Sequence, residues 1–350
     1  MFKAIGYAAQ SATAPLAPMT FERRAPRADD VALEVLFCGV CHSDIHQARN
    51  EWGFASYPLM PGHEIVGKVT SVGTDVTKYK VGDIVGVGCL VDSCRTCEAC
   101  EANLEQYCLE GPTQTYASRD RVDGTLTMGG YSNAMVVSER FVVRIPEKLD
   151  LASAAPILCA GITTYSPLKH FGVKPGDKVG VLGMGGLGHM GIKFAKAMGA
   201  EVTLFTRSEA KAEEGRRQGA DHVIVSTNEG QMKDAAGRFN FLLDTIPVQH
   251  DLNPYLQTLR FDGVHILVGL IEPIDPPVHG FNLVAKRRII AGSMIGGLAE
   301  TQEVLDFCAE HGITCDIEML DIKNINEAFE RVVKGDVKYR FVIDMKTLKA

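Results

Sequence analysis

The first 150 residues carry short apolar runs that Gly, Pro and Asp separate from one another. Runs of this length, rich in β-branched residues and bounded by turn formers, are typical of strands in a compact, mainly antiparallel domain. The pattern predicts strands over Val31–Phe37, Ile65–Val72, Ile84–Val87 and Phe141–Ile145.

The pattern changes near residue 152, and from Lys178 onward apolar strands alternate with helical stretches. Such alternation indicates a doubly wound parallel sheet. Its six predicted strands are Lys178–Leu182, Glu201–Phe205, His222–Val225, Phe241–Asp244, Val264–Val268 and Arg288–Ala291. The remainder has helical stretches around 303–310 and 324–333 and a strand over 339–343, and we expect it to return to the first domain.

We therefore expect an α/β protein with two domains. Residues 1–152 and 297–350 form the mainly β domain in this interpretation, and residues 153–296 form a Rossmann domain. A content of 46% hydrophobic and 23% charged residues is that of an ordinary globular protein, and the longest apolar runs are too short to span a bilayer. The net charge of −7 argues against nucleic acid or anionic lipid as partners. The first residues, Met1–Ile5, lead into an Ala/Pro-rich stretch without the pattern of a signal peptide, so we expect a cytoplasmic protein.

A glycine-rich segment follows the first strand of the predicted parallel sheet. Gly183-Met-Gly185-Gly-Leu-Gly188 fits G-x-G-x-x-G, and it precedes a helical run over 189–198, which is the context that the dinucleotide fingerprint requires. Gly183 permits the tight turn, Gly185 lets the backbone approach a pyrophosphate, and Gly188 allows close packing of helix on strand. The phosphates then meet free N–H groups at the start of the helix.

The end of the next strand bears on the choice of nicotinamide cofactor. NAD enzymes place an acid there to bind the ribose 2′-hydroxyl. This chain has Thr206, Arg207 and Ser208 instead, with Lys211 one helical turn beyond. A guanidinium and hydroxyls suit a 2′-phosphate, which favours NADP(H). The alternative is a solvated helix start, with Glu209 reaching back to the ribose.

Ten cysteines are many for a reducing compartment, and four of them lie within one loop: Cys94, Cys97, Cys100 and Cys108. Four closely spaced thiolates are a standard ligand set for a structural zinc ion. A zinc ribbon on nucleic acid is the alternative, and Glu98, Glu101 and Glu105 disfavour it because they make the loop acidic. Four other cysteines are interpreted as small buried hydrophobes, namely Cys38, Cys89, Cys308 and Cys315.

Other motifs resemble a known family. Gly62-His63-Glu64-Ile-Val-Gly67, followed by Gly73, resembles the zinc signature of medium-chain alcohol dehydrogenases. The match covers nearly the whole chain. Further segments are similar to the cinnamyl-alcohol-dehydrogenase branch, and bacterial NADP-dependent aldehyde reductases of that branch are most alike: Cys41–His46, the four-cysteine loop, Cys159–Pro167, Gly183–Gly191, Gly292–Gly296 and Asp336–Phe341.

The resemblance implies a GroES-like catalytic domain with an inserted Rossmann domain, commonly in a homodimer. It assigns a catalytic zinc to Cys41, His63 and Cys159, which spacing alone could not select because a single Cys or His is more often packed in a core. Three protein ligands leave one position open for substrate. Glu64 resembles a carboxylate that approaches the metal during ligand exchange, and Asp44 would orient His63.

The resemblance also assigns a proton relay from Ser43 through the cofactor ribose to His46, unless His46 is simply a surface histidine. Trp52, Tyr116 and Met294 are candidates for the substrate pocket, although Trp52 could instead pack in the core. Further cofactor contacts are assigned to His42, Thr163, Gly186, Leu187, Thr245, Gly269, Ser293, Ile295 and Arg340; Ile295 is also a candidate for the pocket.

These observations predict an oxidoreductase: a zinc-dependent NADP(H) alcohol dehydrogenase or aldehyde reductase. It would transfer hydride between NADPH and a broad range of aromatic or medium-chain aldehydes to give primary alcohols, as an alcohol dehydrogenase (NADP⁺) does. The alternatives are a dedicated cinnamyl alcohol dehydrogenase, an NAD-dependent polyol dehydrogenase, and a zinc-free relative of the quinone reductases. A non-enzymatic, zinc-stabilised NADP-binding module is the fourth.

Overall fold

The computed structural model describes residues 1–269 and 272–349. The chain divides into two compact units, Met1–Ile162 with Gly296–Ala350, and Thr163–Ile295. The first boundary lies at residue 162 instead of 152, inside α4 (Ala160–His170). It lies there because α3 (Leu151–Ala154) and η3 (Ala155–Leu158) pack against strands of the first unit.

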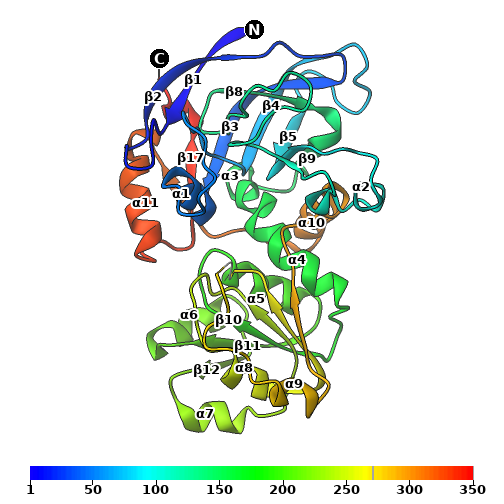
Figure 1. Cartoon of the computed structure of the whole chain (residues 1–350), viewed down its shortest axis with the longest axis vertical. Coiled ribbons are helices and arrows are strands. Elements are labelled where there is room, and N and C mark those ends of the chain that lie inside the picture. The colour runs from blue at the N-terminus through cyan, green and yellow to red at the C-terminus, as the bar shows by residue number, and fades with distance from the viewer. Residues whose placement is uncertain (270–271, 350) are drawn as a thin grey trace. The chain divides into compact units, whose positions relative to one another are not determined.

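A seven-stranded sheet forms the centre of the first unit, in the order β16-β17-β3-β4-β5-β9, with β8 paired to β3 (Figure 1). Its pairs are antiparallel except β16 with β17, in accord with the predicted mainly β fold, and β17 from the last residues pairs with β3. The strands are β3 (Asp30–Val40), β4 (Ile65–Val72), β5 (Ile84–Val87), β8 (Ala134–Ser138), β9 (Val143–Arg144), β16 (Ile317–Leu320) and β17 (Arg340–Asp344).

Two separate antiparallel strand pairs accompany this sheet, and the sequence pattern had not predicted them. They are β1 (Phe2–Ala8) with β2 (Ala17–Arg23), and β6 (Leu90–Asp92) with β7 (Thr113–Gln114). The helices of the unit are α1 (His42–Ala48), α2 (Glu98–Glu101), α10 (Leu298–His311) and α11 (Ile325–Val333), with 3₁₀ turns η1 (Glu105–Tyr107), η2 (Glu139–Phe141), η5 (Ile322–Asn324) and η6 (Met345–Thr347).

One predicted strand of the first unit is wrong in part. The sequence predicted a strand over 141–145, but only Val143–Arg144 forms one. The Ser138 side chain accepts a hydrogen bond from the Arg140 N–H and caps η2, so the backbone is helical through Phe141. A serine before a turn can satisfy backbone donors that a strand would otherwise have to pair.

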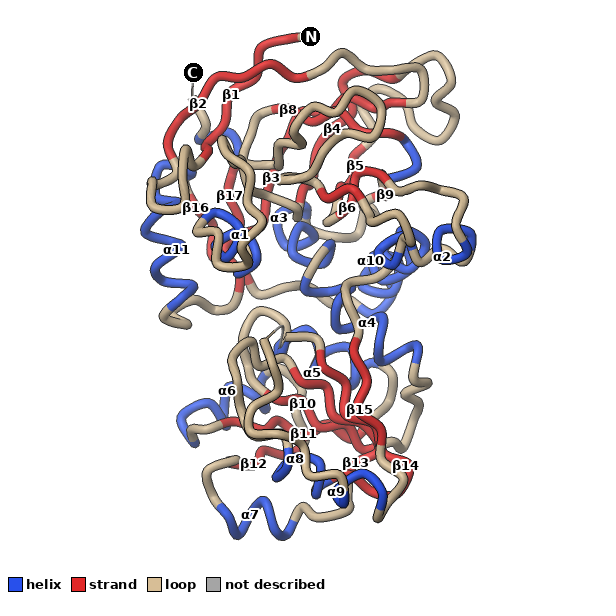
Figure 2. Tube along the Cα trace, viewed as in Figure 1, coloured by secondary structure: helices blue, strands red, loops and turns tan. Residues whose placement is uncertain are grey.

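The second unit has one six-stranded parallel sheet in the order β12-β11-β10-β13-β14-β15, as predicted for a doubly wound fold. Figure 2 shows its strands as one red layer with helices beside it. The strands are β10 (Lys178–Leu182), β11 (Glu201–Thr206), β12 (His222–Val225), β13 (Phe239–Asp244), β14 (Leu259–Leu267) and β15 (Ile289–Gly292). The helices are α5 (Gly188–Ala197), α6 (Ala212–Arg217), α7 (Glu229–Asp234), α8 (Asn253–Thr258), α9 (Phe281–Val284) and the 3₁₀ turn η4 (Glu209–Lys211).

The strand order of this sheet reverses between β10 and β13. In open α/β sheets a ligand binds beyond the carboxyl ends of the strands at such a switch point. Gly183 follows β10 and Thr245 follows β13, so both begin loops at this point. Buried side chains such as Leu182, Phe205 and Leu242 fill the core beneath it.

In the described part of the chain, no single helix combines the length and the apolar character that crossing a bilayer requires. One bent pair, Leu151–Leu158 with Ala160–His170, meets the criteria of length and composition.

Candidate active site

Four potential metal ligands of the first unit converge on one point. Cys41 caps the start of α1, His63 and Glu64 precede β4, and Cys159 ends η3. One ligand atom from each lies within 4.8 Å of all the others, and all four residues are buried. The sulfur atoms of Cys41 and Cys159 are 3.9 Å apart. Two zinc–sulfur bonds of about 2.3 Å at a tetrahedral angle place sulfurs about 3.8 Å apart, so the residues fit zinc.

Asp44 is the centre of the hydrogen bonds around this set, and its side chain is fully buried. Its Oδ1 accepts from the Gly62 N–H at 3.0 Å and lies 3.1 Å from His63 Nδ1. Its Oδ2 accepts from the Cys41 N–H at 2.9 Å and from the Tyr131 hydroxyl at 3.2 Å. Burial lowers the pKa of His63, but Asp44 together with the thiol groups of Cys89 and Cys41 outweighs burial, and the net shift is upward. The contact that orients His63 is therefore present.

Tyr131 was missing from the predicted set. It lies in a loop beside the segment before His63, with the Tyr131 N–H donating to Pro61 O at 3.0 Å. The sequence signal for this contact was the preceding pair Gly129 and Gly130, which lets the loop approach Pro61 closely: a Cβ at Gly129 would lie 2.2 Å from Pro61 O. The fully buried ring of Tyr131 therefore reaches Asp44 from a strand connection 87 residues away in sequence.

Glu64 forms a buried ion pair with Arg340, the first residue of β17. Burial raises the pKa of Glu64, and the guanidinium opposes that shift. A Cβ at Gly39 would lie 1.9 Å from Glu64 Oε2, so only glycine lets this carboxylate pack here. Arg340 had been predicted as a cofactor contact, and the structure places its guanidinium on Glu64.

Helix α1 carries the predicted relay residues His42, Ser43 and His46. The rings of His42 and His46 stack at 4.8 Å, because residues four apart share a helix face. Trp52 stacks on His46 at 5.2 Å, and His46 Nδ1 pairs with Glu51. His46 and Trp52 are both half-buried, so neither a free surface histidine nor a core tryptophan describes them.

Three further side chains complete the surroundings. Tyr116 is buried with its ring 5.7 Å from that of His63. Gln47, one turn beyond Ser43 on α1, is buried, and neither polar atom of its amide has a hydrogen-bond partner among the described residues. Cys89 was expected to be a buried small hydrophobe. It is only half-buried, and its thiol forms a hydrogen bond with the thiol of Cys159. The other three cysteines of that group are buried as predicted.

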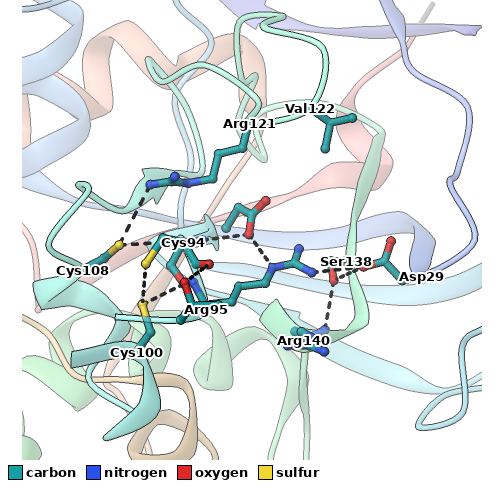
Figure 3. A network of polar contacts seen from close by, with 12 residues as sticks. Asp29, Cys94, Arg95, Cys100, Cys108, Arg121, Val122, Ser138 and Arg140 are labelled. Carbon is teal, nitrogen blue, oxygen red and sulfur yellow. Dashed lines mark hydrogen bonds and ion pairs between the residues drawn. The ribbon is translucent and has the colours of Figure 1, made fainter. Parts of the chain in front are cut away.

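The four-cysteine loop forms the second convergent set, with its sulfur atoms within 4.8 Å of one another. Cys94 Sγ and Cys100 Sγ are 3.8 Å apart, again the separation that tetrahedral zinc requires. A backbone hydrogen bond from Thr96 lowers the pKa of Cys94 to about 6, which favours the thiolate that binds metal. Figure 3 shows Arg121 reaching Cys108, where its Nη2 lies 4.0 Å from the sulfur.

Residues around this loop tie it to the rest of the first unit. In Figure 3, Arg95 extends from the loop to Asp29, which also accepts from the Ser138 hydroxyl at 2.8 Å. Glu105, which sequence analysis took only as part of an acidic face, accepts from the Leu298 N–H at 3.0 Å and so caps α10.

The glycine-rich turn of the second unit has the predicted form. Gly183 has a φ of 87°, the left-handed region that glycine tolerates best. A Cβ at Gly188 would lie 2.2 Å from Gly183 O, whereas one at Gly185 would have no neighbour within 4 Å. Within the described residues, the N–H groups of Gly185, Gly186 and Leu187 have no protein acceptor. The turn therefore offers open space and free donors to a pyrophosphate.

The other predicted nucleotide contacts of this unit lie around that turn or at strand ends. Arg207 and Lys211 are exposed beyond β11, while Ser208 accepts from the Ala210 N–H and caps η4. The Thr245 hydroxyl donates to Leu182 O at 2.7 Å. Gly269 lies against Thr245, where a Cβ would approach to 2.7 Å. Thr163, Ser293 and Ile295 belong to the same unit, as does Met294, whose side chain is exposed.

Two family models match the chain: the alcohol dehydrogenase GroES-like domain over residues 27–147, and the zinc-binding dehydrogenase over residues 186–310. The chain is 55% identical over 347 residues to the aldehyde reductase YahK of Escherichia coli, covering 99% of both chains. The chain belongs to the zinc-containing medium-chain alcohol dehydrogenases.

Solved structures place this medium-chain dehydrogenase in the cinnamyl-alcohol-dehydrogenase-like branch. A cinnamyl alcohol dehydrogenase from Sorghum bicolor superimposes with a TM-score of 0.96 at 45% identity, covering 99% of each chain. The structure of CAD from Helicobacter pylori, complexed with NADP(H), gives 0.92 at 42% identity, covering 98% of each. The predicted fold, with a GroES-like part and a Rossmann part, is confirmed.

Proposed function

We propose that this medium-chain dehydrogenase is a zinc- and NADP(H)-dependent alcohol dehydrogenase that reduces a broad range of aldehydes to primary alcohols in the cytoplasm. The observation that supports it most is the buried convergence of Cys41, His63 and Cys159 beside Glu64. With Glu64 engaged by Arg340, the first three would hold zinc and leave its fourth position for substrate. The aldehyde reductase and NADP(H)-bound relatives support the direction and the cofactor.

Cys41, His63 and Cys159 would hold zinc, which as a Lewis acid supplies polarisation of the substrate carbonyl. Asp44 fixes the ring of His63 by binding Nδ1, which leaves Nε2 for the metal. Arg340 holds Glu64 in an ion pair, so that carboxylate is restrained beside the ligand set. The four-cysteine loop would hold the structural zinc.

The second unit supplies the nucleotide site in this proposal. The free N–H groups of the 183–188 turn would bind the pyrophosphate of NADP(H), a cofactor that would supply the hydride. Thr206, Arg207, Ser208 and Lys211 receive the 2′-phosphate, because hydroxyls and cations suit that group. The absence of an acid at the end of β11 disfavours the NAD-dependent polyol dehydrogenase.

Residues of α1 carry out proton transfer in this proposal. The Ser43 hydroxyl would give a proton to the product oxygen during aldehyde reduction, and His46, three residues along the same helix, would return a proton from solvent to the relay. Glu51 pairs with His46 Nδ1 and so fixes the orientation of the imidazole, the last group of the relay. The substrate is bound by apolar side chains, for which Trp52 and Tyr116 are the candidates of the first unit.

The deciding experiment follows NADPH and NADH oxidation with a panel of aromatic, medium-chain and polyol-derived aldehydes. We expect turnover with many aldehydes, preference for NADPH, and loss of activity on removal of zinc. Restriction to cinnamyl aldehydes would favour the dedicated enzyme. Tight NADPH binding without any turnover by the zinc-loaded protein would favour the non-enzymatic binding module.

We also propose that two copies associate through β15, an edge strand of the parallel sheet. Ile289 on this strand is 48% exposed, and Phe281 and Val284 on α9 are 69% and 82% exposed. An apolar sheet edge is a template for pairing with a second chain. Sedimentation velocity should show a dimer that Ile289→Lys dissociates, whereas Val122→Asp, at an exposed apolar site of the first unit, should not. A monomeric wild type would refute this assembly.

A further inference from the structure

A buried charged cluster lies at the switch point of the parallel sheet, and no part of the catalytic proposal uses it. Asp244, the last residue of β13, is fully buried. Its Oδ2 accepts from His250 Nε2 at 2.9 Å and from His265 Nε2 at 2.8 Å. Its Oδ1 accepts from the Ile246 N–H at 3.1 Å. The carboxylate therefore ties the loop after β13 to strand β14.

His250 has an acceptor at each ring nitrogen. Its Nδ1 lies 2.8 Å from Val248 O, while its Nε2 faces the Asp244 carboxylate. Neither oxygen can donate, and a neutral imidazole carries only one N–H. Both contacts are satisfied as hydrogen bonds only when the ring is protonated at both nitrogens. His265 differs: its Nδ1 is buried without a described partner, so a single proton on Nε2 satisfies it.

The segment that this cluster holds packs directly on the glycine-rich turn. The Thr245 hydroxyl donates to Leu182 O, the last residue of β10. Cβ atoms at Gly183 and Gly188 would lie 3.3 Å and 3.2 Å from Thr245 Oγ1. Displacement of Thr245 would therefore disturb the turn that receives the pyrophosphate.

We propose that protonated His250, acting through Asp244, is a positioning residue for the nicotinamide nucleotide. The ion pair holds residues 245–250 against the glycine-rich turn, so the affinity for the nucleotide falls when His250 loses its proton. The inference rests on the proposed nucleotide site and adds a pH dependence to it. The physical basis is that the apparent affinity for a ligand falls with the fraction of the protein that is in the binding-competent conformation.

The charged groups around His250 fix the sign of the effect. Asp244 faces it from β13, His265 from β14, Asp251 follows it in the loop, and the Tyr255 ring contacts it from α8 at 6.0 Å. Arg207 lies farther off, where it acts on Tyr255. Burial lowers the pKa of His250, but Asp244, supported by the Val248 carbonyl and by Asp251, more than offsets burial and the pKa is raised above 6.5.

Because the pKa of His250 is raised in the folded protein, the ion pair between protonated His250 and Asp244 is fully formed below the ordinary histidine pKa of about 6.5. It is lost as the pH rises through the higher, folded value. Linkage requires the converse as well: a nucleotide that binds more tightly when His250 is protonated must raise the pKa of His250 further.

The test measures dissociation constants of NADH and NADPH by fluorescence titration, from about pH 5.5 to about pH 9. NADH is included because it lacks the 2′-phosphate, which itself titrates near pH 6 and would complicate the NADPH profile. Wild type, His250→Gln and His222→Gln are compared. His222 is a matched control, because it also lies beside a carboxylate, Glu201 at 3.2 Å, but on β12 and exposed.

We expect the NADH dissociation constant of the wild type to rise about tenfold across the titration of His250. His222→Gln should keep that step, while His250→Gln should bind weakly at every pH without it. A step that persists in His250→Gln, or a flat wild-type profile, overturns the inference. Failure of the wild type to bind either nucleotide at any pH would instead overturn the proposed function.

Histidine ring signals in NMR provide a second measurement on the unmodified protein, which decides the matter even if His250→Gln does not fold. The signal of His250, assigned through the variant or through its contact with the Tyr255 ring, should titrate above the ordinary histidine pKa and shift to a higher pKa when NADH is added. An unchanged pKa on saturation with NADH overturns the inference.

Discussion

The replacement of Asp44 by asparagine tests how the catalytic ligand set is held. The carboxylate meets four donors, of which three are the N–H groups of Cys41 and Gly62 and the Nδ1–H of His63. An amide has one acceptor atom. If that atom faces His63 and Gly62, the amide NH₂ faces the Cys41 N–H, and the two donors oppose each other.

The cost follows from those contacts. A buried donor without an acceptor costs about 1–3 kcal/mol, and the remaining bonds lose the strength that a charged acceptor gives. A total of about 3 kcal/mol would lower the melting temperature by about 6–12 °C, since each kcal/mol shifts a unit of 150–250 residues by about 2–4 °C. Loss of the carboxylate behind His63 should also weaken zinc binding about 10–100-fold.

The assay follows zinc release to a chromogenic chelator. Wild type should release one zinc per chain slowly from each site, whereas Asp44→Asn should release one of the two much faster. Asp177→Asn is the control, because Asp177 is also buried and accepts from the Lys174 N–H at 3.0 Å, but lies in the second unit. Equal release from Asp44→Asn and wild type would refute the assignment of Asp44 as the group that holds His63.

Three further perturbations have defined outcomes. Arg207→Ala should raise the KM for NADPH about tenfold with little change for NADH, because the exposed guanidinium contributes one charge-assisted contact; equal effects on both would contradict its role. Cys97→Ser should halve the zinc content and lower the melting temperature, while Cys315→Ala, at a buried cysteine outside both sets, should keep two zinc ions by elemental analysis. The pKa of Asp120 is lowered to about 2: burial raises it, but the Arg27 guanidinium and the N–H groups of Val122 and Asp123 together outweigh burial. Its contribution is therefore present above pH 4 and lost as pH falls toward 2, so Asp120→Asn should reduce the loss of thermal stability over that range.

The sequence predicted the parallel sheet well because its strands are continuous apolar runs between turn residues. Lys178–Leu182 and His222–Val225 have the predicted bounds. The β1–β2 pair was missed because much of β2 is exposed and polar positions interrupt it. Helix α1 was missed because it has only seven residues and most of them are polar, so no apolar periodicity indicates a helix.

A site was easier to predict from the sequence when its residues lie close together along the chain. The four-cysteine loop is recognisable from spacing, since its ligands fall within one loop. Cys41 and Cys159 are 118 residues apart, and only family resemblance selected them. Tyr131 on Asp44, Arg340 on Glu64 and His250 on Asp244 could not be foreseen, because such contacts depend on which strands the topology brings together.

The position of β17 has a consequence for the order of assembly during synthesis. This strand lies between β16 and β3, so the sheet of the first unit stays open until residues 340–344 have left the ribosome. Residues 163–295 are contiguous and can fold earlier, since domains fold as units during translation. The four-cysteine loop can take up its metal early, because short loops close at small entropic cost. Glu64 gains Arg340 last, so a ribosome stalled before residue 340 would carry a nascent chain with a folded nucleotide unit and an unfinished catalytic centre.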